Sequence, residues 1–246
     1  MKFGMTSLTL KNESVENVIR IVKEAGLSGI EWGVSEGHQP LCDAERAALI
    51  RKLSEENGIE IFSLGSYCYM ETKEECDQAL ETAVLLGAPI IRIWAGKNAP
   101  ADCDDAYRQL IVENTKYMAD KAKEHNIVLG FEYHPWTLTE TCDEAFLLIE
   151  SVGKENVGLY WQPQSNLSLE ENLRDRDRVL TACVGNMHVQ NYNEQTGYHL
   201  LSELKELAPY FKELSDKPYN LMIEFVKGGE IENLMKDAQA LRDTLR

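Results

Sequence analysis

Short apolar runs alternate with longer amphipathic segments along the whole chain, and few folds accommodate such a pattern. Buried strands are expected at 2–6, 29–32, 59–64, 90–94, 128–132, 157–161, 184–189 and 220–225. Helices are expected at 14–25, 43–57, 73–86, 104–125, 142–152, 169–180, 201–214 and 231–245. Continuous apolar strands that alternate with helices are typical of a parallel sheet covered by helices.

The number and spacing of these units favour a closed barrel over an open sheet. Eight strand–helix units in 246 residues match a (β/α)8 TIM barrel, in which one unit takes roughly thirty residues. The rival doubly wound sheet often has a glycine-rich first turn, and 5–9 contains no such motif. No linker or change in composition divides the chain. We therefore predict one TIM-barrel domain over 1–246.

Composition excludes several classes of partner. The formal net charge of −16 disfavours nucleic acid and anionic membrane surfaces, both of which attract basic proteins. No apolar stretch approaches the length that spans a bilayer. The six cysteines form no C-x-x-C pair, and a strand-like segment rather than a signal peptide follows Met1. We expect free thiols and a cytoplasmic protein.

Two glutamates and a histidine lie at the ends of predicted strands. Glu132 and Glu224 each end an apolar run, and His188 lies in a third run. Side chains at the carboxyl ends of barrel strands converge on one site. Carboxylates are rarely buried without a partner. We therefore expect these three residues to meet around a divalent metal or a shared substrate, and a mixed oxygen and nitrogen set suits Mn²⁺, Co²⁺, Mg²⁺ or Zn²⁺.

Other strand ends supply polar and aromatic side chains to the same site. Trp94, Trp161 and Gln190 follow or end predicted strands. His134 lies two residues after Glu132 and, in extended chain, on the same side. Aromatic faces cover C–H surfaces, while amides and imidazoles bind hydroxyls. These four residues are predicted to bind a small polyhydroxylated substrate.

Four motifs together resemble a known family. They are Gly130–Pro135, Val157–Pro163, Gly185–Val189 and Met222–Glu224. Their order and spacing are similar to the ligand strands of the xylose-isomerase-like sugar isomerase and epimerase barrels. That group includes ketose 3-epimerases, hydroxypyruvate isomerase, inosose dehydratase, dehydroshikimate dehydratase and endonuclease IV. The resemblance covers essentially the whole chain.

The resemblance implies a ligand set and a chemistry. The family's Glu, Asp, His and Glu ligands fall on Glu132, Gln162, His188 and Glu224. Gln162 replaces the usual Asp, and a neutral amide adds no charge, so a weakly bound metal is expected. The usual Lys-Asp after the histidine strand is replaced by Gln190 and Asn191. In the family a metal stabilises an enediolate, while the two glutamates act as acid and base.

The expected function is thus a metal-dependent isomerase or epimerase of a small sugar, keto-sugar or cyclitol. Resemblance also implies a homodimer or homotetramer. A dehydratase acting on a similar substrate is the closest alternative. A glycosidase that uses Glu132 and Glu224 is another. A carbohydrate-binding barrel or subunit with little catalysis is a third, and Gln162 is the feature that supports it.

Overall fold

The computed structural model describes residues 1–245 of the protein, which form a closed barrel of eight parallel strands. Around the barrel the strands follow the order β1-β10-β7-β6-β5-β4-β3-β2. They are β1 (Lys2–Thr6), β2 (Gly29–Gly33), β3 (Glu60–Gly65), β4 (Ile90–Ile93), β5 (Val128–Phe131), β6 (Val157–Trp161), β7 (Cys183–Val189) and β10 (Asn220–Ile223). The predicted TIM barrel is confirmed.

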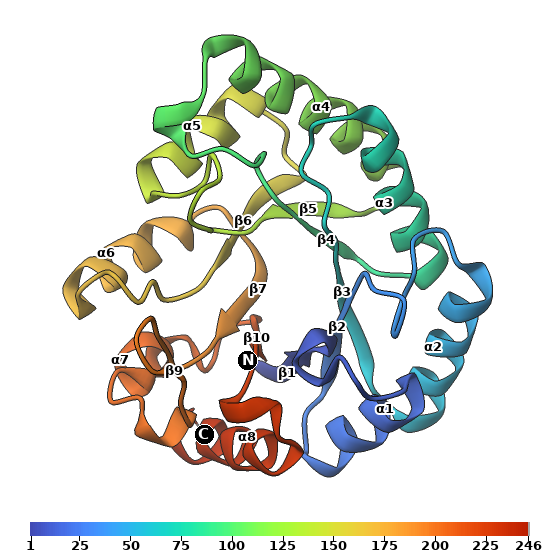
Figure 1. Ribbon diagram of the computed structural model, residues 1–246, viewed down its shortest axis with the longest axis vertical. Coiled ribbons are helices and arrows are strands. Elements are labelled where there is room, and N and C mark those ends of the chain that lie inside the picture. The colour runs from blue at the N-terminus through green and yellow to red at the C-terminus, as the bar shows by residue number, and fades with distance from the viewer. Residues whose placement is uncertain (246) are drawn as a thin grey trace.

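Helices surround the strands, as Figure 1 shows. They are α1 (Val15–Glu24), α2 (Ala44–Asn57), α3 (Lys73–Leu86), α4 (Asp105–Glu124), α5 (Cys142–Val152), α6 (Leu169–Val179), α7 (Leu207–Phe211) and α8 (Ile231–Leu245). The last helix lies beside the first, where Arg242 donates a hydrogen bond to the carbonyl of Ala25. This contact links α8 to the end of α1 and closes the ring of helices around the barrel.

Local sequence signals explain where most helices begin and end. Helices α1 to α6 each follow a Ser, Thr or Asp whose side chain accepts a hydrogen bond from a backbone N–H of the first turn. Such caps satisfy donors that a helix leaves free. Gly58, Gly87 and Gly153 then end α2, α3 and α5 in the left-handed conformation that glycine adopts without strain.

The segment after β7 differs from the prediction. A single helix was expected over 201–214, but the structure has a 3₁₀ turn at Leu201–Glu203, the short helix α7, and a second 3₁₀ turn at Lys212–Leu214. Pro209 lies within α7 and lacks the N–H that a regular helix would use there. The prediction of one continuous helix was therefore wrong.

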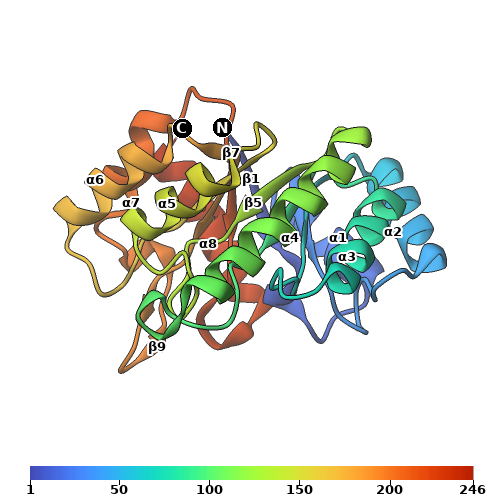
Figure 2. The same cartoon turned by 90° about the horizontal axis from the view of Figure 1, so that it is seen from above.

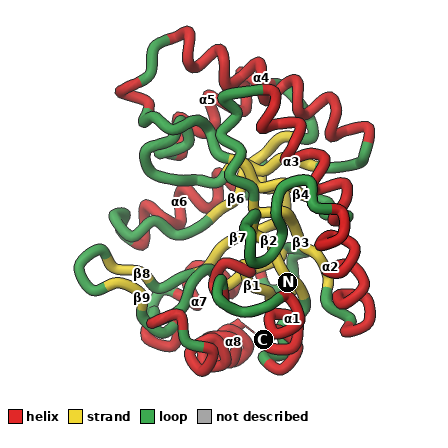
Figure 3. Tube along the Cα trace, turned by 45° about the vertical axis from the view of Figure 1, so that its right-hand side comes forward, coloured by secondary structure: helices red, strands yellow, loops and turns green. Residues whose placement is uncertain are grey.

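A small antiparallel hairpin between β7 and α7 was not predicted. It consists of β8 (Tyr192–Asn193) and β9 (Gly197–Tyr198). The hairpin projects from the barrel beside α7, as Figures 2 and 3 show. Strands of two residues are too short to give a periodic sequence signal. The hairpin matters because its residues line the cavity described below.

Glycines in the strands make room for two large side chains inside the barrel. A Cβ atom on Gly29 would lie 2.3 Å from the ring of Phe62, and one on Gly130 would lie 2.6 Å from the ring of Tyr160. Real side chains do not approach so closely, so glycine is required at both positions. Tyr160 consequently crosses the interior, and its hydroxyl reaches 3.0 Å from a carboxylate oxygen of Glu31.

A buried carboxylate outside the barrel supports the segment that follows the hairpin. Asp237 in α8 accepts a 2.7 Å hydrogen bond from the backbone N–H of Leu201. Burial, together with Glu203, raises the pKa of Asp237 to about 6, although the Leu201 N–H acts in the opposite direction. Because the folded protein then binds this proton more tightly than the unfolded chain, stability falls as the pH rises through about 4 to 6.

We expect Asp237→Asn to stabilise the protein at pH 7.5 by about 1–2 kcal/mol. The amide oxygen keeps the bond to Leu201, while the cost of burying a charge disappears. Melting temperatures measured at pH 4 and pH 7.5 check this, because the difference between variant and wild type should vanish at pH 4. The matched control is Asp243→Asn, at an exposed position of the same helix. An equal gain at both pH values would contradict the prediction.

Candidate metal centre and active site

Three side chains from different strands meet at the carboxyl end of the barrel. Glu132 follows β5, His188 lies in β7 and Glu224 follows β10. Each offers one ligand atom, and these atoms lie within 4.8 Å of one another. The Nδ1 atom of His188 is 3.4 Å from Glu224 Oε2 and 3.7 Å from Glu132 Oε1. The structure thus brings together the three residues that the sequence analysis grouped.

Gln162 joins this group through its carbonyl oxygen. Its Oε1 lies 3.3 Å from His188 Nδ1, and its amide nitrogen donates a 2.9 Å hydrogen bond to the backbone carbonyl of Tyr133. That donated bond orients the amide, because only the nitrogen can donate to a carbonyl. Four potential ligand atoms, three oxygens and one nitrogen, therefore face a common point.

A buried arginine that the sequence analysis did not single out lies beneath this point. Arg92 in β4 donates from Nε to Glu31 at 2.9 Å and from Nη1 to Glu132. The Arg92 side chain is 4% exposed, and those of Glu31 and Glu132 are 1% and 3% exposed. One guanidinium thus bridges two buried carboxylates. An arginine within the apolar run Ile90–Ile93 was the available signal, since a buried charge requires a partner.

Glu31 connects Arg92 to the histidine. Its Oε1 atom lies 3.4 Å from His188 Nε2, on the side of the ring away from Glu132 and Glu224. Ser63 donates a 2.8 Å hydrogen bond to Glu31 Oε2. The register shift between β2 and β3 places Glu31 opposite Ser63. A carboxylate beside one nitrogen of a histidine leaves the other nitrogen free for a metal.

The charges of this network act on one another. Burial opposes ionisation of Glu132 and Glu31, but Arg92 and His188 together outweigh it, so the pKa of Glu132 lies well below its usual range and that of Glu31 is about 2. Burial acts to lower the pKa of His188, but Glu224 and Glu31 outweigh it and raise this pKa well above its ordinary value. In the absence of a cation, the imidazole is therefore the group that takes up positive charge between the carboxylates.

The donor set fits a divalent cation. With neutral His188, the three carboxylates of Glu31, Glu132 and Glu224 exceed the single positive charge of Arg92 by two. A divalent ion facing His188 Nδ1 balances that excess. Carboxylate, amide and imidazole ligands are compatible with Mg²⁺, Mn²⁺, Co²⁺ or Zn²⁺. His188 Nε2 forms no regular hydrogen bond among the described residues. In the neutral tautomer that carries its proton on Nε2, the N–H would point toward Glu31 and Nδ1 would be free for the ion.

Gln162 is the ligand position whose change is simplest to interpret. Gln162→Asp adds a negative charge on a side chain one methylene shorter, and we expect the dissociation constant for Mn²⁺ to fall by about tenfold or more. Isothermal titration calorimetry checks this expectation. The control is Gln164→Asp, at a neighbouring glutamine that also lines the cavity but lies outside the ligand group. An unchanged constant would show that residue 162 does not contact the ion.

Aromatic side chains form one wall beside the three ligands. Trp94 follows β4 and donates from its indole nitrogen to Glu132. The ring of His134 stacks on Trp94 with centroids 4.7 Å apart, and Trp136 packs edge-on against both. Trp94, His134 and Trp136 all line the same cavity, as does Gln190. Three of the four residues predicted to bind the substrate, Trp94, His134 and Gln190, therefore line this cavity.

Trp161 does not belong to this wall. It is fully buried and packs against Tyr210 and Phe211, with ring centroids 5.8 and 5.4 Å away. Successive residues of a strand point to opposite faces. Because Tyr160 and Gln162 point into the barrel, Trp161 points outward into the helix layer. The prediction that Trp161 contacts the substrate was wrong for this reason.

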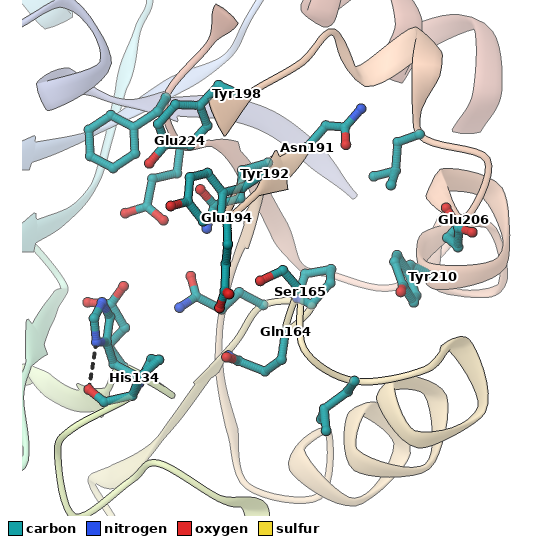
Figure 4. Close-up of a pocket in the computed structure, with 18 of the residues that line it drawn as sticks. His134, Gln164, Ser165, Asn191, Tyr192, Glu194, Tyr198, Glu206, Tyr210 and Glu224 are labelled. Carbon is teal, nitrogen blue, oxygen red and sulfur yellow. Dashed lines mark hydrogen bonds between the residues drawn. The ribbon is translucent and has the colours of Figure 1, made fainter. Parts of the chain in front are cut away.

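The cavity at the barrel mouth has a volume of about 810 Å³. Glu224 of the ligand group lies at one side with Tyr198 of the hairpin beside it, and Glu206 and Tyr210, at the start of and within α7, lie at the other side, as the close-up in Figure 4 shows. Tyr192, Tyr198 and Phe225 line it and were not among the predicted site residues. Tyr192 and Tyr198 lie in the two-residue strands of the hairpin, which carry no local sequence signal, and Phe225 follows β10 directly after Glu224.

All six cysteines are free in the structure, as expected from the sequence. Within residues 1–245, no helix has the length and apolar composition needed to cross a bilayer.

Comparison with known proteins agrees with this geometry. The model of the xylose isomerase-like TIM barrel family matches residues 19–244. A 3-dehydroshikimate dehydratase from Bacillus anthracis is 24% identical over 167 residues, which are 64% of this chain and 60% of that protein. A 2-oxo-tetronate isomerase from Pectobacterium atrosepticum is 34% identical over 62 residues, 25% of this chain and 24% of that protein. Both matches span less than two thirds of the relatives' lengths.

Solved structures match over nearly the whole chain. The probable 3-DHS dehydratase AsbF from Bacillus anthracis superposes with a TM-score of 0.80 at 19% identity, covering 98% of this chain and 99% of that one. A xylose isomerase-like TIM barrel protein from Mycobacterium smegmatis in complex with magnesium gives a TM-score of 0.71 at 17% identity, with 100% and 98% covered. These likenesses show the fold. Together with the family match, they establish that the chain belongs to the xylose isomerase-like TIM barrel family.

Proposed function

We propose that the protein is a divalent-metal-dependent isomerase or epimerase of a small sugar, keto-sugar or cyclitol. The observation that carries the proposal is the approach of Glu132, Glu224 and Gln162 oxygens to one nitrogen of His188 at the edge of a large cavity. A bound divalent cation supplies Lewis-acid polarisation of a substrate carbonyl. Polarisation acidifies the C–H bond on the neighbouring carbon, so a carboxylate can remove that proton.

The two glutamates differ in how they are held. Glu132 accepts hydrogen bonds from Arg92 and Trp94 through Oε2, which leaves Oε1 toward the ligand group. Glu224 has a side chain that is 11% exposed, lines the cavity and approaches His188. A proton-transferring carboxylate must reach the substrate carbon and change its protonation state. We assign that role first to Glu224, with Glu132 as the more firmly positioned ligand and second acid–base group.

The aromatic wall and Gln190 support a carbohydrate substrate. The stacked Trp94 and His134 rings offer an apolar face to sugar C–H groups, and Gln190 can both donate to and accept from hydroxyls. The glycosidase alternative is less well supported. His188 Nδ1 lies within 3.7 Å of both carboxylates, so the ring occupies the space between them that a glycosidic bond would need.

A dehydratase is the second candidate. It is favoured by the similarity to 3-dehydroshikimate dehydratase. Both reactions begin with removal of a proton next to a carbonyl. In an isomerase or epimerase the proton then returns to carbon. In a dehydratase a hydroxyl leaves from the adjacent carbon instead, which gives a dehydrated product.

Solvent-deuterium exchange tests the proposal across many candidate substrates at once. The purified protein is freed of metal with a chelator, reloaded separately with Mn²⁺, Mg²⁺, Co²⁺ or Zn²⁺, and incubated in D₂O with a panel of ketoses and keto-cyclitols. We expect metal-dependent deuterium at the carbon next to the carbonyl of at least one compound, detected by NMR. The same spectra identify an epimer, an isomer or a dehydrated product. Metal binding without exchange in any compound would instead support a carbohydrate-binding barrel.

A further inference from the structure

We propose that the cavity takes an uncharged carbohydrate longer than one sugar ring. One ring would lie at Glu132, His188 and Glu224, and a second ring would lie near Glu206 and Tyr210. The placement of the first ring rests on the proposed function. The second position, its chemistry and the absence of charge on the substrate go beyond that proposed function.

The cavity extends well beyond the ligand group. Its volume of about 810 Å³ lies toward the upper end of the roughly 300–1,000 Å³ found for pockets that bind drug-sized ligands. Figure 4 places Glu224 at one end and Glu206 and Tyr210 at the other, with Gln164 and Ser165 between them. A single sugar ring held at the ligand group would leave the far end to water.

The far end of the cavity, together with the part that leads to it from Glu224, offers hydroxyl, amide and aromatic groups. Gln164 donates a 3.1 Å hydrogen bond to the carbonyl of Tyr133, which leaves its own carbonyl oxygen available. Ser165 is exposed and adds a hydroxyl, and Glu206 is half-buried. The ring of Tyr192 is 40% exposed and packs 5.0 Å from that of Tyr198. Hydroxyl and amide partners beside an aromatic face suit a sugar ring.

The far end of the cavity carries negative rather than positive charge. Among the described residues that line the cavity, the basic side chains are Arg92 and His134, both at the end that holds the ligand group. Arg92 already contacts Glu31 and Glu132. The far end carries the carboxylate of Glu206 instead, and that of Glu194 lies between the two ends, as Figure 4 shows. A phosphate or carboxylate at the far end would meet a like charge and no cation, whereas sugar hydroxyls can donate to the Glu206 carboxylate.

Calorimetry with defined sugars tests the inference. Mn²⁺-loaded full-length protein is titrated with D-fructose, with four disaccharides that contain fructose (lactulose, maltulose, isomaltulose and turanose), and with fructose 6-phosphate. We expect at least one disaccharide to bind tenfold or more tightly than fructose, and fructose 6-phosphate to bind more weakly than fructose. The inference is overturned if no disaccharide binds more tightly than fructose, or if the phosphate ester binds most tightly.

A variant locates the second ring. Glu206→Ala should lower the affinity for the preferred disaccharide toward that of fructose, whereas Lys205→Ala, which changes a neighbour outside the cavity lining, should not. Equal effects of both variants, or none from Glu206→Ala, would refute this position. Deuterium exchange tests the proposed function independently of the second ring. Exchange without disaccharide preference refutes only the second ring, and Glu206-dependent disaccharide binding without exchange refutes only the chemistry.

Discussion

Glu224→Gln is expected to lower the rate of deuterium exchange into the substrate by about 10²- to 10⁴-fold, the usual contribution of a general acid–base group. Glutamine has nearly the same shape and keeps an oxygen that can face the ligand group, as the Gln162 oxygen faces His188 Nδ1. It cannot accept a proton from carbon. The rate at saturating Mn²⁺ and substrate therefore isolates proton transfer from any loss of metal affinity.

A nearby glutamate provides the matched control. Glu230 follows the same strand but is exposed and lies outside the cavity lining. Glu230→Gln should exchange deuterium at the wild-type rate. If Glu224→Gln at saturating metal retained more than about a tenth of the wild-type rate, Glu224 would not be a principal base, and Glu132 would have to carry the proton.

The stability of the two glutamine variants should differ. Glu224 contacts His188 at the edge of the cavity, so its replacement should change the melting temperature little. Glu132→Gln removes a charge that Arg92 needs in the buried interior. The two carboxylates look equivalent in sequence, because each simply ends an apolar run. The structure distinguishes them, because Glu132 is held by Arg92 and Trp94 whereas Glu224 is accessible from the cavity.

The sequence predicted the barrel because periodicity and helix caps are local signals. Apolar runs mark the strands, and residues such as Thr72 and Gly87 mark where α3 begins and ends. The grouping of Glu132, His188 and Glu224 followed from topology, because parallel strands in a barrel all end at one mouth. The barrel and the helix ends do not depend on the orientation of a side chain.

The errors arose where the outcome depends on orientation or on distant contacts. Trp161 ends a strand as Trp94 nearly does, but one residue of register turns its ring to the outer face. Arg92 lies inside a strand, and its two carboxylate partners are 61 and 40 residues away in sequence. Tyr192 depends on a hairpin with two-residue strands. Local sequence therefore predicts the cavity lining less well than the ligand group.

Arg92→Met is expected to destabilise the protein by about 3–5 kcal/mol, because it leaves the carboxylates of Glu31 and Glu132 buried without their cation. For a domain of this size that corresponds to a fall in melting temperature of roughly 6–20 °C. Methionine fills most of the space of the arginine stem, so the loss reports mainly charge. Arg20→Met removes an exposed pair with Glu24, whose side chains are about half exposed, and should cost less than about 1 kcal/mol.

The pH dependence separates loss of charge pairing from loss of packing. Burial acts to raise the pKa of Glu31, but Arg92, His188 and Ser63 together lower it to about 2 in the folded protein, against an ordinary value of 4.5. A carboxylate with a lowered pKa stabilises the fold above its unfolded pKa, and this contribution is lost as the pH falls toward the folded pKa. Without Arg92 the largest of the three favourable influences on Glu31 is missing at every pH. The difference in unfolding free energy between wild type and Arg92→Met, measured by denaturant titration, should therefore be largest above about pH 5 and shrink steadily toward pH 3. A difference that stays constant over this range would mean that Arg92 stabilises the barrel through packing alone.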